Sequence, residues 1–310
     1  MSPPRAPSNT DELKAQLGPL AWAEPVLDRF FKVRAFDAFL ERIHVAGRPD
    51  FFTSAMEQAG LCNTWSDQCL ARIPRAGPLV VVANHPHGLA DGLVAMDFLL
   101  RARPDTLVVG NRWLSQIPGI RPWLIEVNPF RPDAADPGNI AGTRRILAHL
   151  RAGGCIMTFP SGEVSSLRLK SRRVDDPVWS PQVVRMARKV GASILPMRIE
   201  GRNSGLFQSL GLIHPKLRTM LLLREFLNHH GKVIRLRTAN PVTPAQLADH
   251  PEDEEATSFL RLRCELLSSR TDRQKAAAAK PAAPQASIIA PVNPLLLRAE
   301  LQSLPPEDLL

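Results

Sequence analysis

The stretch Leu79–Gly92, LVVVANHPHGLADG, joins a run of β-branched residues to a polar turn that holds two histidines and an aspartate. An uninterrupted apolar run of this length, rich in valine, predicts a strand buried on both faces of a sheet. Asn84, Pro86 and Gly88 end the strand, and the apolar segment 93–101 predicts a helix that packs back on it. The stretch therefore predicts one strand of an α/β sheet that delivers polar side chains to the edge of the sheet.

His85 and Asp91 lie on opposite sides of this predicted loop. In that arrangement the carboxylate accepts an imidazole N–H and leaves the second ring nitrogen to act as a general base. Two other interpretations are open: His85 only bonds the backbone at the strand end, or His87 is the imidazole that pairs with Asp91. These three side chains also suggest a metal site, but no further cluster of ligands is visible in the sequence, so we predict no bound metal.

Strand and helix patterns alternate through the central part of the chain. This alternation predicts an α/β fold with a mostly parallel sheet flanked by helices and preceded by N-terminal helices. Active sites in such sheets gather where the strands end. The predicted strands are residues 79–83, 106–109, 155–159, 193–199 and 233–237, and the predicted helices are residues 93–101, 139–151, 181–190 and 216–228.

A second polar loop, Phe159–Ser165, FPSGEVS, follows the predicted strand 155–159. Its glycine turn is expected to expose backbone N–H groups, which suit an anionic headgroup or a developing oxyanion. The alternative is an ordinary strand-to-helix turn. A basic run, Arg168 to Arg173, comes next and is either a solvated face or a surface for lipid headgroups or an acidic carrier protein.

Three blocks resemble motifs of the lysophospholipid (glycerolipid) acyltransferase superfamily and occur in the same order. They are Asn84-His85-Pro86 with Asp91-Gly92, then Phe159–Ser165, then Ile194–Met197 with Gly201–Ser204. The gap of five residues between His85 and Asp91 is similar to that of the haemolysin-like and ornithine-lipid acyltransferase branch. The resemblance covers roughly residues 30 to 270.

The resemblance implies an O-acyltransferase that moves a fatty acyl group from an acyl-carrier-protein or acyl-coenzyme A thioester to a lysolipid hydroxyl, with no other cofactor. It implies His85 as the general base and Asp91 as the group that fixes its tautomer. We expect a lyso-ornithine-type acceptor, with 1-acylglycerol-3-phosphate as the alternative. Val164 stands where the superfamily often has a phosphate-binding arginine, and Glu163 would repel a phosphate. The residues expected to bind substrate are His87, Arg131, Phe159, Pro160, Ser161, Gly162, Glu163, Arg202 and Asn203.

The 310 residues carry a formal net charge of +9, which suits anionic lipid or nucleic acid as a partner. A non-enzymatic nucleic-acid-binding protein is the alternative of another class, but tyrosine is absent and aromatic residues make up only 5%, which disfavours base-stacking platforms. A hydrolase is disfavoured because no GxSxG motif occurs. We therefore expect membrane lipids and the thioester carrier as partners, and no nucleic acid.

Localisation is predicted from what the chain lacks. The four cysteines have no metal-site spacing and indicate a reducing cytoplasm. No apolar stretch reaches the roughly 18 to 20 residues of a membrane span, and the N-terminus does not read as a signal peptide. We expect a cytoplasmic protein that binds peripherally to the inner face of the cell membrane.

Composition divides the chain into segments. Within the N-terminal helical region, residues 25–45 place apolar side chains at helical spacing. This apolar face either packs on the core or lies in the headgroup boundary of a membrane, with Arg29, Lys32 and Arg34 beside it. The predicted segments are a disordered N-terminus (1–9), the N-terminal helical region (10–70), an acyltransferase domain (71–270), an Ala/Pro-rich linker (271–287) and a C-terminal tail (288–310).

Overall fold

The computed structural model describes residues 24–43, 51–117, 119–127, 137–169, 171–213 and 215–275. The chain divides into two units, Met1–Thr271 and Asp272–Leu310, and the sheet belongs to the first unit. The predicted disordered N-terminus, the start of the predicted N-terminal helical region, Arg131 and the C-terminal tail lie outside the described residues.

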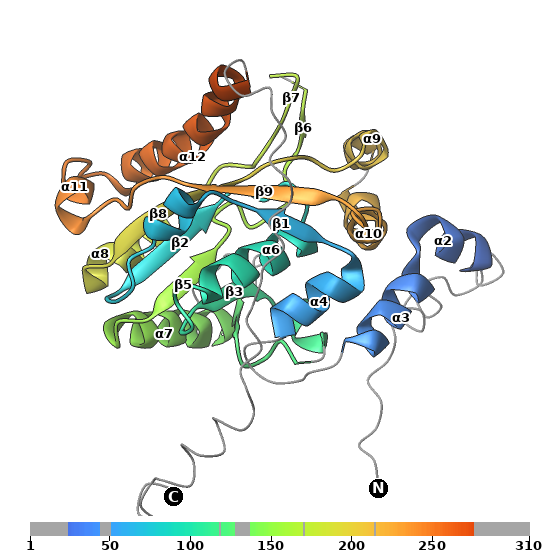
Figure 1. Ribbon diagram of the computed structural model, residues 1–310, viewed down its shortest axis with the longest axis horizontal. Coiled ribbons are helices and arrows are strands. Elements are labelled where there is room, and N and C mark those ends of the chain that lie inside the picture. The colour runs from blue at the N-terminus through green and yellow to red at the C-terminus, as the bar shows by residue number, and fades with distance from the viewer. Residues whose placement is uncertain are drawn as a thin grey trace, which may run out of the picture. The chain divides into compact units, whose positions relative to one another are not determined.

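A seven-stranded sheet forms the centre of the first unit (Figure 1). The β-branched strand β2 lies in its middle and pairs in parallel with β5 on one side and β8 on the other. Every neighbouring pair is parallel except β8 with β9, so the predicted mostly parallel sheet is confirmed. The strand order is β1 (Cys62–Thr64), β9 (Val233–Thr238), β8 (Ser193–Ile199), β2 (Leu79–Ala83), β5 (Cys155–Thr158), β3 (Leu107–Asn111) and β4 (Leu124–Val127).

Strand β2 is buried along its whole length because both faces of the sheet are covered. Leu79, Val81 and Ala83 pack into one apolar core with helices α4 and α6, whereas Val80 and Val82 point to a second core with α7, α8 and α12. This alternation is the two-residue period of a strand. The covering helices are α4 (Phe51–Ala59), α6 (Leu89–Leu100), α7 (Pro137–Arg151), α8 (Gln182–Val190) and α12 (Asp253–Lys275).

Helix α6 begins earlier than the sequence indicated. It starts at Leu89 rather than at Leu93, so Asp91 lies in its first turn and not in the preceding loop. Gly88 takes a positive φ of 81°, a conformation that glycine adopts without strain, and its N–H is bonded by the Asp91 carboxylate. This local cap starts the helix before the apolar run begins.

Several elements of the structure were not predicted from the sequence. Strands β6 (Ser166–Arg168) and β7 (Arg173–Asp175) form a short antiparallel hairpin from the basic run, and α12 carries charge along most of its length. Because α12 continues to Lys275, the expected linker at 271–287 begins too early: Arg273, Gln274 and Lys275 are good helix formers. The other unpredicted elements are β1, β4, α5 (Asp67–Ala71), the 3₁₀ helix η2 (Arg112–Gln116), α9 (Gly205–Ile213) and α11 (Pro244–Ala248).

The N-terminal apolar segment forms two helices, α2 (Glu24–Phe31) and α3 (Val33–Arg42), separated at Lys32, whose φ is 59°. The rings of Phe36 and Phe39 are buried and lie 5.7 and 4.9 Å from that of Phe226 in α10 (Pro215–Leu227). The apolar face of α3 therefore packs on the core of the first unit. The interpretation that this face lies in a membrane does not hold for α3.

Candidate active site

The site is built at the carboxyl end of β2, where the chain leaves the sheet. The Asn84 side chain extends the β2–β8 pairing by one step: its Nδ2 donates to the Ile199 carbonyl at 2.9 Å, and its Oδ1 accepts from the Ile199 N–H at 2.8 Å. An asparagine side chain carries an NH₂ donor and a carbonyl acceptor, so it can bond to both backbone groups of one residue. This pair of bonds fixes the point from which the polar loop departs.

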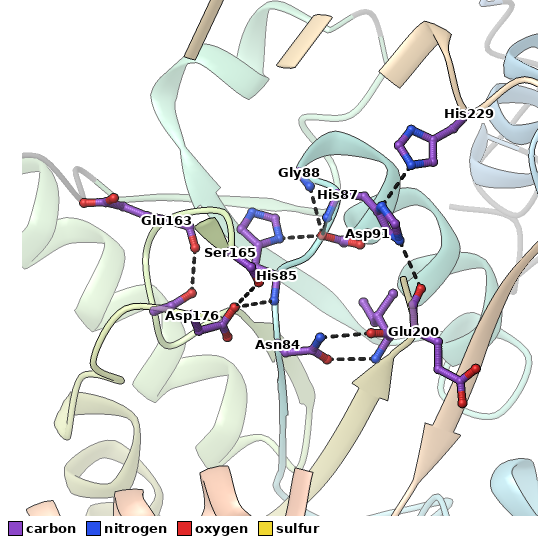
Figure 2. Close-up of polar contacts among 12 residues, drawn as sticks. Asn84, His85, His87, Gly88, Asp91, Glu163, Ser165, Asp176, Glu200 and His229 are labelled. Carbon is purple, nitrogen blue, oxygen red and sulfur yellow. Dashed lines mark hydrogen bonds and ion pairs between the residues drawn. The ribbon is translucent and has the colours of Figure 1, made fainter. Parts of the chain in front are cut away.

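The predicted pairing of His85 with Asp91 is present in the structure. His85 Nδ1 lies 2.9 Å from Asp91 Oδ2 (Figure 2). The same oxygen accepts the backbone N–H groups of His87 at 2.8 Å and Gly88 at 2.9 Å. Three donors on one oxygen at the start of a helix stabilise the ionised carboxylate. With Nδ1–H directed at Asp91, His85 Nε2 carries the lone pair, which is the arrangement of a general base.

His85 is also fixed through its backbone, by Asp176, which the sequence did not indicate, and by Ser165, the last residue of the second polar loop. The His85 N–H donates to Asp176 Oδ1 at 3.2 Å, and its carbonyl accepts from the Ser165 N–H at 2.8 Å. The Ser165 hydroxyl donates to the same Asp176 oxygen, and the indole N–H of Trp179 donates to the other at 2.9 Å. Asp176 and Ser165 thus join the histidine loop to the second polar loop.

The second polar loop, 159–165, lies directly against the imidazole. The Phe159 ring stacks on that of His85 with a centroid distance of 4.0 Å and an interplanar angle of 22°. Pro160 is buried, and Gly162, at a φ of 67°, closes a turn by donating to the Phe159 carbonyl at 3.0 Å. Ser161 donates from its hydroxyl to the Glu163 carbonyl at 2.8 Å. The two predicted loops therefore form one site.

Glu163 and Val164 point to different surroundings. The Glu163 carboxylate is half exposed, points away from His85 in Figure 2, and forms an ion pair of 2.8 Å with Arg218 of α10. Val164 is buried in an apolar cluster with Phe207 and Leu221. A charged side chain at position 164 would be buried in that apolar cluster, which disfavours an arginine there. The charges of this part of the loop are those of the Glu163–Arg218 pair.

The remaining predicted residues within the described structure are His87, Arg202 and Asn203. His87 is buried and does not place its ring on the carboxylate: Nε2 lies 3.0 Å from the Glu200 carbonyl and Nδ1 lies 2.9 Å from His229 Nε2. Arg202 is exposed. Asn203 is buried, and its amide has no hydrogen-bond partner among the described residues.

The described residues contain no group of three or more histidine, cysteine, aspartate or glutamate side chains placed to hold a metal ion. None of the helices in that part of the chain is long and apolar enough to cross a membrane.

A parallel sheet that presents a carboxylate-ordered imidazole beside a polar loop is a site for general-base catalysis, and acyl transfer is a reaction that such a base serves. A family model described as "Acyltransferase" matches residues 31–273, and the chain belongs to this family. It is an O-acyltransferase of the lysophospholipid acyltransferase superfamily, so the non-enzymatic alternative is wrong.

Two curated relatives are each named lyso-glycine lipid O-acyltransferase. The protein from Phocaeicola vulgatus is 26% identical over 59% of this chain and 69% of its own length. The protein from Bacteroides thetaiotaomicron is 26% identical over 66% of this chain and 75% of its own length. Among solved structures, the 1-acyl-sn-glycerophosphate (LPA) acyltransferase PlsC from Thermotoga maritima aligns with 88% of this chain and 95% of that chain, with 18% identity and a TM-score of 0.47.

Proposed function

We propose that this O-acyltransferase moves a fatty acyl group from an acyl-carrier-protein or coenzyme A thioester to the hydroxyl of a lysolipid with an amino-acid headgroup, such as lyso-ornithine lipid. The contact of 2.9 Å between His85 Nδ1 and Asp91 Oδ2 carries the proposal. It leaves His85 Nε2 as the atom that receives the proton of the acceptor hydroxyl.

In the proposed reaction the acceptor oxygen attacks the thioester carbonyl carbon while His85 Nε2 takes the hydroxyl proton. The buried Asp91 carboxylate stabilises the imidazolium that forms. The carbon–sulfur bond then breaks, and His85 returns the proton to the departing thiolate. The products are the acylated lipid and a free thiol, and the histidine is neutral again.

The acceptor is inferred from the Glu163–Arg218 ion pair. An amino-acid headgroup joined through its α-amino group keeps a free carboxylate, which Arg218 can bind, and ornithine adds an ammonium group, which Glu163 can bind. A phosphate would be attracted by Arg218 but repelled by Glu163, so the ion pair favours a headgroup that carries both charges over a phosphate alone. The names of the two curated relatives also point to an acceptor built on an amino acid.

The comparison needs purified protein, each thioester donor in turn, and lyso-ornithine lipid, lyso-glycine lipid and lysophosphatidic acid at matched concentrations. We expect higher kcat/KM with the amino-acid lipids. Glu163→Gln should narrow the preference for lyso-ornithine lipid over lysophosphatidic acid about tenfold, since a charged hydrogen bond contributes about 1.5–3 kcal/mol. Glu252→Gln, at an exposed residue before α12, is the matched control and should change nothing.

A preference for lysophosphatidic acid that Glu163→Gln leaves unchanged would contradict the proposed acceptor. The phosphate would then be bound by the basic hairpin, where Arg168 and Arg173 stand opposite each other in β6 and β7. The enzyme would in that case be a 1-acylglycerol-3-phosphate acyltransferase.

We further propose that the protein binds to the membrane surface through a rim that carries both charge and apolar side chains. The hairpin presents Leu169, which is 69% exposed. Hairpin and α9 are joined by a bond of 2.8 Å from the Leu167 N–H to Gln208 Oε1. Exposed leucines beside arginines suit the boundary between acyl chains and anionic headgroups. This hairpin–α9 rim consists of Arg168, Leu169, Arg172, Arg173, Leu206 and Leu212.

A further inference from the structure

Behind the catalytic loop, two buried imidazoles form a continuous chain of hydrogen bonds that ends on a backbone carbonyl at each side. His87 Nε2 lies 3.0 Å from the Glu200 carbonyl, His87 Nδ1 lies 2.9 Å from His229 Nε2, and His229 Nδ1 lies 2.5 Å from the Glu225 carbonyl. The two side chains are almost fully buried. Figure 2 shows His87 between Asp91 and His229.

The three contacts require three ring hydrogens. A carbonyl oxygen only accepts, so His87 Nε2 and His229 Nδ1 must each carry a hydrogen, and the contact between the rings needs one more. Two neutral imidazoles hold only two N–H hydrogens between them. If the two rings held only two hydrogens and both donated to the carbonyls, the lone pairs of His87 Nδ1 and His229 Nε2 would face each other.

We propose that the His87–His229 pair holds one excess proton and that this buried cation positions the Asp91–His85 couple. Its role in positioning rests on the proposed function of His85 as the base. The proton belongs on His87, which then donates from both ring nitrogens, while His229 is neutral with its hydrogen on Nδ1. The cation lies behind Asp91, whose Oδ1 is buried without a hydrogen-bond partner among the described residues.

The charges around the two rings agree with a proton on His87 and a neutral His229. Burial, followed by the charge of His87 and then that of Lys232, lowers the pKa of His229, while the Glu225 carbonyl and Asp91 act in the opposite direction. The lowered pKa of His229 is consistent with its being the neutral ring of the pair. The Glu200 carboxylate, at the end of β8, is held by Arg237 at 2.5 Å and by Arg235 at 3.8 Å.

The pair acts on catalysis through the backbone of His87. The His87 N–H is one of the three donors on Asp91 Oδ2, so a shift of this residue moves the carboxylate that orders His85. The ring is confined from a third side by Gly201, where a Cβ would come within 2.5 Å of His87 Nε2. His87 and His229 are thus positioning residues that tie the loop after β2 to β8 and α10.

Nitrogen NMR of the full chain with labelled histidine tests the inference directly. At pH 8 an ordinary imidazole, with a pKa of about 6.5, is neutral. We expect one ring to keep both N–H groups at that pH, and we expect His229→Leu to abolish this signal because no acceptor faces His87 Nδ1. His229→Gln should retain it, since its amide oxygen can accept. His230→Leu is the matched control, because the adjacent His230 ring lies outside the chain of bonds, with its Nδ1 at 3.2 Å from the Ala59 carbonyl.

The kcat and KM of the same variants provide a second test of the inference. His229→Leu should lower kcat on the order of 10- to 100-fold at nearly unchanged KM, as expected when a catalytic group is misplaced, and His229→Gln should recover most of the rate. A wild-type chain in which every ring has lost its second proton by pH 8, or a folded His229→Leu with unchanged kcat, would overturn the inference. The NMR signal does not depend on the acceptor, so it stands or falls separately from the proposed function.

Discussion

Asp91 does more in this site than contact one imidazole. Its Oδ2 accepts from the His85 ring and from two backbone N–H groups of the loop, at distances of 2.8 to 2.9 Å. The carboxylate therefore shapes the loop and orders the base at the same time. Its place in the first turn of α6 adds the favourable field of a helix N-terminus to these bonds.

At this position charge and shape can be separated. Asp91→Asn keeps the size of the side chain but lacks the negative charge that stabilises the imidazolium, and we expect kcat to fall on the order of 10³-fold.

His85→Ala should abolish transfer without unfolding the chain, because the side chain is partly exposed in a loop. Both are measured as thioester consumption, with circular dichroism to verify folding.

Asp249→Asn, at an exposed carboxylate that ends α11, is the matched control and should behave like wild type. Wild-type turnover in Asp91→Asn or in His85→Ala would remove the residue concerned from the proposed mechanism.

Residues of the site could be predicted from the sequence only where the chain itself brings them together. His85 and Asp91 are six positions apart in one stretch. Asp176, in contrast, is 91 positions from His85, and His229 is 142 positions from His87. No periodic pattern marks either one, because their neighbours in space are set by the packing of the sheet rather than by local sequence.

Among the helices and strands, those whose side chains are mostly buried in the apolar core were predicted correctly from the sequence. β2 and β8 are apolar, buried runs, and the predicted limits of both strands coincide with the observed ones. The β6–β7 hairpin and α12 could not be predicted in the same way. The hairpin strands have only three residues each, too few to show a period, and α12 buries a narrow apolar stripe, which includes Ala256, Leu260 and Cys264, within an otherwise charged helix.

Helix α3 offers a test of where the N-terminal apolar face lies. Phe39 is 2% exposed and its ring lies 4.9 Å from that of Phe226, so Phe39→Ala should lower the free energy of unfolding by about 3–5 kcal/mol. Val26→Ala in α2, at a residue that is 70% exposed, should change it by less than about 0.5 kcal/mol. Urea denaturation of the free protein measures both values. Equal, small effects would mean that α3 does not pack on the core in solution.

Across the whole molecule, charge and apolar surface can act together at a membrane. The chain has a net charge of +9, and the hairpin–α9 rim adds leucines that are exposed beside its arginines. Electrostatic attraction acts over about 8 Å at physiological salt, whereas burial of a leucine contributes about 1.5–3 kcal/mol whatever the salt concentration. The two terms can therefore be measured separately.

Binding to vesicles that contain anionic lipid should weaken steeply as salt rises, because added ions screen the arginines of the rim. Leu169→Asp should weaken binding at every salt concentration, since it removes an apolar anchor and adds a charge that anionic lipid repels. Val233→Asp is the matched control, because Val233 is similarly exposed, at 63%, but belongs to β9 outside the rim. Vesicle sedimentation gives the bound fraction in each case. If the control lost as much binding as Leu169→Asp, the membrane would be contacting another surface; if salt had no effect, the arginines would have no part in binding.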